Sequence, residues 1–123
     1  MDILVSNPSD TPISQQIYEQ LRSQILAGTL KSDACLPPIR TAAAELRVSV
    51  ITVKKAYEAL EREGLLYAVT GRGTFVAPLR AAEREDRRAR LAEEALAREL
   101  SRCKALGLGK AEALALVERL YGD

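Results

Sequence analysis

Hydroxyl and ammonium side chains gather in one short stretch near the middle of the chain. Ser49 and Thr52 are followed by Lys54 and Lys55, and no acidic residue intervenes before Glu58. Hydroxyl groups, basic side chains and the free backbone N–H groups at the start of a helix all bind phosphate oxygens. This stretch therefore favours non-covalent recognition of a polyanion, for which DNA is the leading candidate.

Catalytic chemistry has no comparable group of residues. The chain contains no histidine, no glycine-rich phosphate-binding motif and no cluster of metal ligands. Its acidic residues stand beside arginine and lysine rather than in a recognisable pair, so we expect no enzyme, no metal and no cofactor. The two cysteines, Cys35 and Cys103, form no CxxC pair, and we expect two small buried apolar side chains rather than a disulfide.

The composition is that of a folded protein, with 47% hydrophobic and 28% charged residues. The net charge of +1 does not by itself indicate a nucleic-acid partner, but residues 36–78 carry six basic and four acidic side chains. This basic excess agrees weakly with a DNA-binding surface in that segment. No apolar run approaches the roughly 18 residues of a membrane span, and no leader segment is evident, so we expect a cytoplasmic protein without a membrane partner.

The elements that must position these residues begin with a helix near the N-terminus. Apolar residues recur at every fourth position from Ile13 to Ile25, which predicts a single amphipathic helix. Thr11 is expected to cap this helix, with Pro12 as its first residue, and Gly28 is expected to end it.

Two further helices are predicted to carry the polyanion-binding stretch. The first is short and covers residues 38–46, and the second begins after Ser49, a natural N-cap, and ends at Gly64. The second of these helices has one apolar stripe at helical spacing, which we expect to be buried. The stripe consists of Val53, Ala56, Tyr57 and Leu60.

After Gly64 the apolar pattern becomes that of a β-hairpin. We expect strands over residues 65–69 and 74–77, joined by a tight turn over residues 70–73 in which Gly71 and Gly73 allow positive φ angles. Three helices followed by such a hairpin is the order of a winged helix–turn–helix. In that fold the third helix enters the major groove, about 12 Å wide in B-DNA, and the wing reaches a neighbouring backbone or groove.

This order predicts a DNA-binding domain over residues 1–78, mainly α with a small β-hairpin. The candidates for base contact at the start of the third helix are Val50, Ile51, Thr52 and Lys54. Lys55 supplies further positive charge, and Arg72 stands at the wing tip between two glycines. Two apolar residues among the base-contact candidates favour contact with thymine methyl groups over a guanidinium–guanine pair.

Residues 79–123 are predicted to form a helical dimerisation tail of two helices. Alternating arginine and acidic residues near its start indicate a solvated helix surface. The tail also has apolar stripes that so short a helical pair cannot bury on itself, and a second copy of the chain would cover them. The predicted dimerisation residues are Leu91, Leu96, Leu100, Cys103, Leu114, Val117, Leu120 and Tyr121.

Three sequence motifs in fixed order give a resemblance to a known family. The pattern LPxxR covers residues 36–40, VSxxTVxxAYxxLxxEGL covers residues 48–65, and GxGTFV covers residues 71–76. Together they resemble the GntR family of bacterial regulators. Tyr57 and the short helical tail are similar to the YtrA-type branch, which implies that the tail serves dimerisation rather than holding a large effector domain.

The resemblance also implies which residues contact DNA. The phosphate- and base-contacting positions of the family fall on Arg40, Ser49, Val50, Ile51, Thr52, Lys54, Thr70, Gly71 and Arg72. Three positions depart from the family pattern. Pro38 replaces a serine that caps the second helix, Arg47 replaces a glycine in the turn, and Val50 replaces an arginine that reads bases, which puts any inherited operator sequence in doubt.

The function expected from these observations is sequence-specific DNA binding by a homodimer, as a repressor more than an activator, on a pseudo-palindromic operator. The alternative is a winged helix that serves protein interaction or assembly without binding an operator. Exposed residues on the third helix without an acid before Glu58 favour DNA. A small-molecule effector is allowed but not identified.

Overall fold

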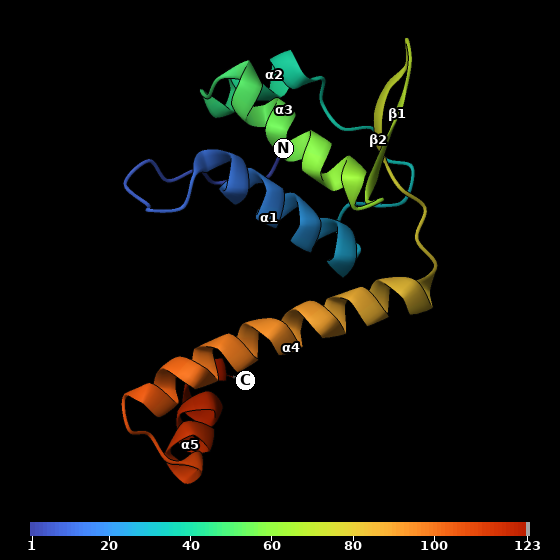
Figure 1. Cartoon of the computed structure of the whole chain (residues 1–123). Helices are drawn as coiled ribbons and strands as arrows, with labels where there is room; N and C mark the ends of the chain where they lie inside the picture. Colours follow the sequence, from blue (N-terminus) through green and yellow to red (C-terminus); the bar gives the residue numbers. More distant parts are fainter. Residues whose placement is uncertain (123) are drawn as a thin grey trace. The chain divides into compact units, whose positions relative to one another are not determined.

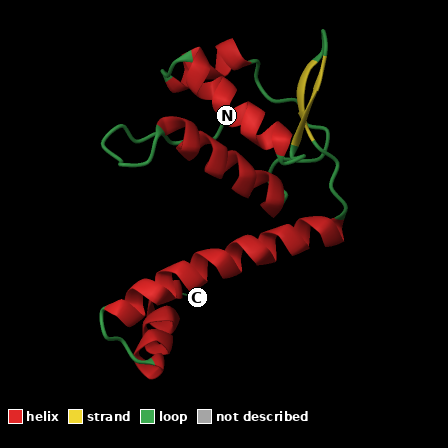
Figure 2. Cartoon of the chain, viewed as in Figure 1, coloured by secondary structure: helices red, strands yellow, loops and turns green. Residues whose placement is uncertain are grey.

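The structure is a computed structural model that describes residues 1–122. Its elements are α1 (Ile13–Ala27), α2 (Ile39–Leu46), α3 (Val50–Arg62), β1 (Leu66–Val69), β2 (Gly73–Val76), α4 (Ala81–Ala105) and α5 (Lys110–Tyr121), as Figure 1 shows. The chain divides after Glu85 into two compact units, which are described separately below as the head and the tail unit. The expected fold class, mainly α with one β-hairpin (Figure 2), is confirmed.

Helix α1 buries one apolar stripe, as its sequence predicts. Ile17, Leu21 and Ile25 are almost fully buried, and they lie one helical turn apart. Gly28 ends the helix in the left-handed conformation (φ 83°), also as expected. The start differs by one position, because Pro12 with extended backbone is the N-cap, and the predicted capping role of Thr11 is wrong.

Helices α2 and α3 pack together through small residues and one tyrosine. Ala42, Ala43 and Ala56 are buried, and their short side chains allow the two helices to approach closely. Tyr57 is buried at the start of this interface and donates a hydrogen bond to the carbonyl oxygen of Pro37 (2.8 Å). Burial raises the pKa of Tyr57 far above its ordinary value, so the hydroxyl stays protonated and keeps this bond.

The wing is wider than the hairpin that the sequence predicts. Strands β1 and β2 pair antiparallel, with Tyr67 opposite Phe75, and each strand lies within one residue of its predicted bounds. A third extended segment, residues 33–36, pairs along β2 through the hydrogen bonds of Leu36 N–H to Thr74 O (2.8 Å) and of Val76 N–H to Ala34 O (2.9 Å). The sequence pattern predicts no strand for this segment.

Cys35 corrects another expectation. Its backbone forms the isolated bridge to Phe75, and side chains alternate between the two faces of an extended segment. Leu36 is therefore buried while Cys35 is exposed, so the prediction of a buried Cys35 is wrong. Both cysteines are free thiols, as expected, but Cys103 is half-buried rather than buried as predicted.

An extended N-terminal arm, residues 2–6, is bound by glutamines of α1. Gln16 and Gln20 each bond both the N–H and the carbonyl of one arm residue, Ser6 and Leu4 respectively, at distances of 2.6 to 2.9 Å. Gln24 donates to the carbonyl of Asp2 (2.8 Å). Ile3 is buried between these contacts, so the arm belongs to the packed head.

The tail unit contains most of α4, the break at residues 106–109 and α5. In the part of the chain that the structure describes, every buried residue lies between Ile3 and Val76, and the tail unit has none. Glu112 closes the start of α5 by accepting a hydrogen bond from the N–H of Gly109 (3.2 Å). The predicted helix–break–helix order is confirmed, and among the described residues no helix is long and apolar enough to cross a membrane.

Candidate nucleic-acid interface

The start of helix α3 is fixed by its own N-cap. The N–H of Thr52 donates to Ser49 Oγ (3.1 Å), and the two hydroxyl oxygens lie 2.7 Å apart in a second hydrogen bond. The capping role expected of Ser49 is thus confirmed. The N–H groups of Val50 and Ile51 have no acceptor within the helix, because the first turn lacks preceding carbonyls at the right spacing. They leave a helix N-terminus that attracts anions.

The side chains around this N-terminus differ in their exposure and in whether they already have an interaction partner. Ile51 is 69% exposed and Val50 38% exposed, whereas Thr52 is half-buried. Lys54 forms an ion pair with Glu58 one turn later (3.8 Å), and both side chains are about half exposed or more. Such an exposed pair is weak, so the ammonium of Lys54 can exchange Glu58 for a phosphate at little cost.

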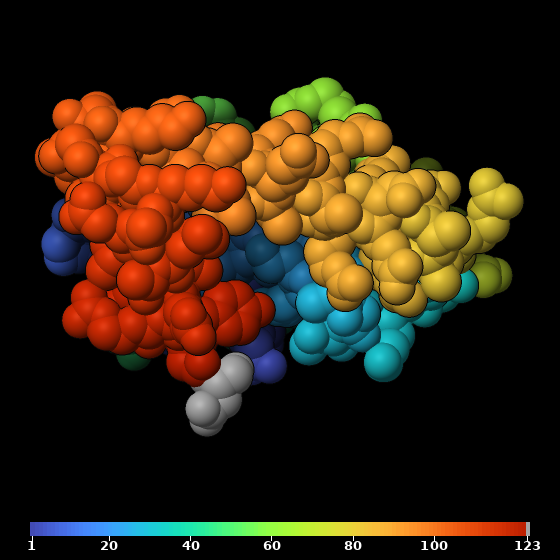
Figure 3. Space-filling model, turned by 90° about the horizontal axis from the view of Figure 1, so that it is seen from below, coloured from blue at the N-terminus to red at the C-terminus, as the bar shows by residue number. Residues whose placement is uncertain are grey.

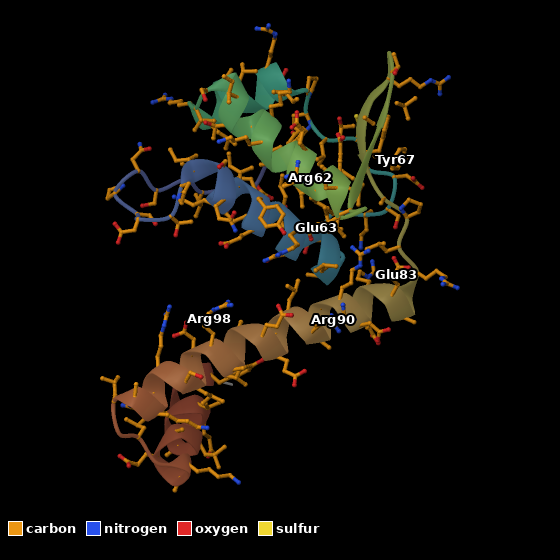
Figure 4. All side chains as sticks on the ribbon, viewed as in Figure 1. Arg62, Glu63, Tyr67, Glu83, Arg90 and Arg98 are labelled. Carbon is orange, nitrogen blue, oxygen red and sulfur yellow. The ribbon has the colours of Figure 1, made fainter. Side chains whose placement is uncertain are left out.

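Lys55 lies apart from the other candidates. It lines a groove between α1 and α3, together with residues such as Tyr18 and Arg62. The hydroxyl of Tyr18 donates to Glu63 and accepts from Arg22 (2.9 Å), so this groove contains charges of both signs. Figure 4 labels Arg62 and Glu63 at the end of α3 that is far from Ser49. Lys55 therefore lies at the edge of the candidate interface rather than at its centre.

The wing tip carries the second group of candidates. Thr70, Gly71 and Arg72 are all exposed in the turn between β1 and β2. Gly71 has φ 78° and nothing lies within 4 Å of the Cβ position, so glycine is needed there for its backbone and not for space. The turn closes through the hydrogen bond of Arg72 N–H to Val69 O (2.9 Å), which leaves the guanidinium at the tip.

The base of the wing is stiffened on its outer face. The rings of Tyr67 and Phe75 stack with centroids 5.5 Å apart, and Tyr67, labelled in Figure 4, donates a hydrogen bond to Asp33 (2.7 Å). That bond to Asp33 raises the pKa of Tyr67 above its ordinary value. The contacts tie the third extended segment to the hairpin, so the wing presents its tip on a firm base.

Helix α2 and the turn after it contribute two further cations. Arg40 is exposed at the second position of α2, whose N-cap, Pro38, offers no side-chain hydrogen bond, as expected. Arg47 is exposed in the turn before α3 and holds the left-handed conformation (φ 57°, ψ 48°) that glycine adopts most readily. Sequence reasoning considered Arg47 only as a departure from a pattern. Its position two residues before Ser49 was the signal that it belongs among the candidate cations.

The residues predicted for dimerisation lie on open surfaces of the tail unit. Leu91, Leu100 and Cys103 are half-buried, while Leu96 (53%), Leu114 (60%), Val117 (42%), Leu120 (75%) and Tyr121 (83%) are exposed. Figure 3 shows α5 lying along the end of α4, and the crevices between these two helices are lined mainly by apolar side chains, with Lys104 and Lys110 beside one of them. Leu106, 81% exposed, was missed because it lies in the break between the helices.

Comparison with protein-family models gives one match over the head. Residues 13–76 match the model described as bacterial regulatory proteins, gntR family. The matched range contains α1 to β2, and with them every residue predicted above to contact DNA.

Curated relatives are similar mainly over the same segment. The chain is 47% identical over 77 residues to the probable rhizopine catabolism regulatory protein MocR of Rhizobium meliloti, a match that covers 63% of this chain and 16% of that protein. It is 39% identical over 74 residues to the HTH-type transcriptional repressor YtrA of Bacillus subtilis, covering 60% of this chain and 57% of YtrA. These matches therefore span less than two thirds of either relative.

One relative is matched over most of both lengths. The chain is 31% identical over 106 residues to the HTH-type transcriptional regulator YhcF of Bacillus subtilis, and the match covers 86% of this chain and 87% of YhcF. This similarity continues into the tail, and the similarity to YtrA agrees with the branch that the short tail implied.

Two solved structures resemble the chain over different shares of its length. A GntR family transcriptional regulator from Listeria monocytogenes matches with a TM-score of 0.80 and 26% identity, covering 90% of this chain and 96% of its own. AraR(DBD) in complex with operator ORX1 matches with a TM-score of 0.55 and 34% identity, covering 63% and 96%. The second match puts the fold of the head beside that of a protein solved on DNA.

Proposed function

This chain belongs to the GntR family of bacterial regulatory proteins, and from that membership we propose that it represses transcription by binding a pseudo-palindromic operator as a homodimer. The observation that carries the proposal is the start of α3. It combines a Ser49 cap, open N–H groups, no acidic residue in the first turn and exposed side chains at Val50, Ile51 and Lys54. YtrA is named a repressor, and the structure titled AraR(DBD) holds an operator, which supports the same activity here.

In the proposed complex the first turn of α3 enters the major groove. Ser49 and Thr52 place their hydroxyls, and the helix its N–H groups, toward phosphate oxygens, which orients the helix without reading sequence. Val50, Ile51 and Lys54 then face base edges. Arg72 at the wing tip contacts the backbone or the minor groove, where a cation meets enhanced negative potential.

Arg40 and Arg47 complete the electrostatic part of the interface. Both are exposed on the segment that leads into α3, and each neutralises a phosphate when it reaches the backbone. Such contacts make affinity depend on salt, and each removed cation lowers that dependence by about one unit of slope.

The homodimer is supported by the surface of the tail unit. Leu114, Leu120 and Tyr121 line the crevices between α4 and α5 but leave most of their surface exposed, and a second copy related by a two-fold axis buries the same residues on both sides. A two-fold dimer presents two α3 helices to half-sites of opposite orientation, which is why the operator is expected to be pseudo-palindromic. We propose that residues 79–123 form the dimerisation tail. We also propose that the protein acts in the cytoplasm, where its operator DNA is.

A gel-shift titration at several salt concentrations tests DNA binding. The probes are the DNA upstream of the chain's own operon and an unrelated duplex of the same length. We expect both to be retained at low salt, and the upstream fragment alone to remain bound as salt rises. If no fragment is retained at low salt, the DNA-binding function is wrong and the interaction-module alternative takes its place.

A further inference from the structure

The first turn of α3 carries two adjacent apolar side chains that no element of the head covers. Val50 and Ile51 are 38% and 69% exposed, although both lie in the first turn of α3, directly after the cap. The head otherwise exposes large apolar side chains at Met1 and Leu4 of the N-terminal arm and at Val69 beside the wing tip. Away from the arm, the exposed apolar groups of the head therefore lie on the two elements proposed to face DNA.

Stabilisation of the helix does not explain why positions 50 and 51 carry apolar side chains. The positions that stabilise a helix start by apolar contact are the one before the cap and the fourth helical residue. Val48, half-buried, and Val53, fully buried, occupy those positions. Val50 and Ile51 are β-branched, a class that restricts side-chain freedom in helices, so they are not there for helix propensity either.

The polar groups nearby do not provide a strong reader of guanine. Helix α3 has no arginine before Arg62, so its first three turns lack the guanidinium fork that pairs with the major-groove edge of guanine. Lys54, the first cation of α3 itself, is paired with Glu58 at 3.8 Å. Ser49 and Thr52 are hydrogen-bonded to one another. What this turn offers freely to a base edge is apolar surface.

We infer that Ile51, with Val50 beside it, reads the C5 methyl group of a pyrimidine in each operator half-site. The C5 methyl is the apolar group that bases display in the major groove, and it is carried by thymine and by 5-methylcytosine. This inference rests on the proposed function and adds to it the chemical feature that the site recognises. It also makes affinity sensitive to a modification of DNA that leaves base pairing unchanged.

The test uses the full chain and a duplex selected by it from a randomised library. Each thymine of the selected duplex is replaced in turn by deoxyuridine, which removes the methyl group and nothing else. Burial of one methyl group corresponds to about a fourfold change in Kd, so one thymine in each half-site should show that loss. In Ile51→Ala, the same replacement should cost nothing further.

Leu4→Ala is the matched control, because it removes a similar apolar group that is 86% exposed and lies on the N-terminal arm. It should keep the full response to deoxyuridine. Ile51 is exposed and alanine favours helix, so Ile51→Ala should fold, which circular dichroism checks. Duplexes with cytosine or 5-methylcytosine at the responsive position then show which base supplies the methyl group. Tighter binding of the 5-methylcytosine duplex shows that the methyl group of either base is recognised. Equal binding of the two duplexes shows that only the methyl group of thymine is recognised.

Two results would overturn the inference while leaving DNA binding intact. In one, no deoxyuridine replacement weakens binding by the wild-type chain. In the other, the replacement costs Ile51→Ala as much as it costs the wild type. Failure of the proposed function would give a different result, because no duplex would then be selected from the library or retained at low salt.

Discussion

The head and the tail unit differ in how much apolar surface each buries within itself. The head, through Val76, contains every buried residue of the described chain, and its helices, wing and N-terminal arm cover one another. The tail unit buries none of its described residues, yet it exposes Leu96, Leu114 and Leu120. A folded unit of this kind gains little stability from its own contacts, since apolar burial is the main favourable term. We therefore expect the head to fold by itself and the tail unit to need a further surface for its stability.

Removal of the tail is the change with the largest expected effect on this contrast. A chain ended after Glu85 keeps the whole compact head, and we expect it to be a folded monomer. Losing the second binding head should weaken operator binding by a factor of about 10² or more. Sedimentation equilibrium gives the mass, and an operator titration gives the affinity. A shortened chain that remains dimeric would show that the head, not the tail, forms the interface.

A pair of leucine truncations separates the two units within the full chain. Leu60 is fully buried in the head, so Leu60→Ala should lower the free energy of unfolding by about 2–5 kcal/mol. Leu120 is 75% exposed, and Leu120→Ala should change the unfolding of the monomer by less than about 0.5 kcal/mol. Instead it should weaken dimerisation, seen as a midpoint of unfolding that depends more on protein concentration. Equal destabilisation of the monomer by both variants would contradict the contrast.

Loss of a wing cation should affect binding without affecting the fold. Arg72→Ala removes an exposed guanidinium and should weaken operator binding by roughly 1–3 kcal/mol if it reaches a base or a narrow groove. Arg98→Ala in the tail unit removes the same group from another exposed position (Figure 4) and serves as the control. Similar affinities for Arg72→Ala and the wild type would remove the wing tip from the interface.

The smallest expected effect is a gain in stability within the head. Arg47 holds a left-handed conformation (φ 57°), which glycine adopts without the steric cost of a Cβ atom. Arg47→Gly should therefore raise the free energy of unfolding by about 0.5–1 kcal/mol while lowering DNA affinity through the lost charge. Arg40→Gly, in helix α2, should instead destabilise by about 1 kcal/mol. Chemical denaturation measures both, and destabilisation by Arg47→Gly would mean that its side chain contributes more than the strain costs.

Much of the fold could be predicted because its signals are local. The spacing of Ile17, Leu21 and Ile25 and the cap at Ser49 depend on residues within a few positions of one another. The third extended segment of the wing could not be found in this way, because Leu36 meets Thr74 across a long stretch of chain and residues 33–36 show no strand pattern. The exposure of Cys35 follows from that same pairing and was missed with it.

The candidate site shows the same division. The residue types and their place on α3 were predicted from motif and spacing, and the structure adds which groups are already engaged. The pairing of Lys54 with Glu58 and the position of Lys55 along a groove toward α1 depend on side-chain geometry that sequence spacing leaves open. The assignment of these residues to DNA contact stays a prediction until binding is measured.

The glutamines that hold the N-terminal arm join two backbones of different spacing, every fourth residue of helix α1 and every second residue of the arm. Four residues of α-helix advance about 6 Å, while two residues of extended chain advance about 6.6 Å. The mismatch is about 0.6 Å for each such step. Gln16 and Gln20 each form two hydrogen bonds to the arm, whereas Gln24 donates a single one, to the carbonyl of Asp2. The turn over residues 7–11 brings the arm back along α1, and the paired hydrogen bonds of Gln16 and Gln20 fix it there in one register.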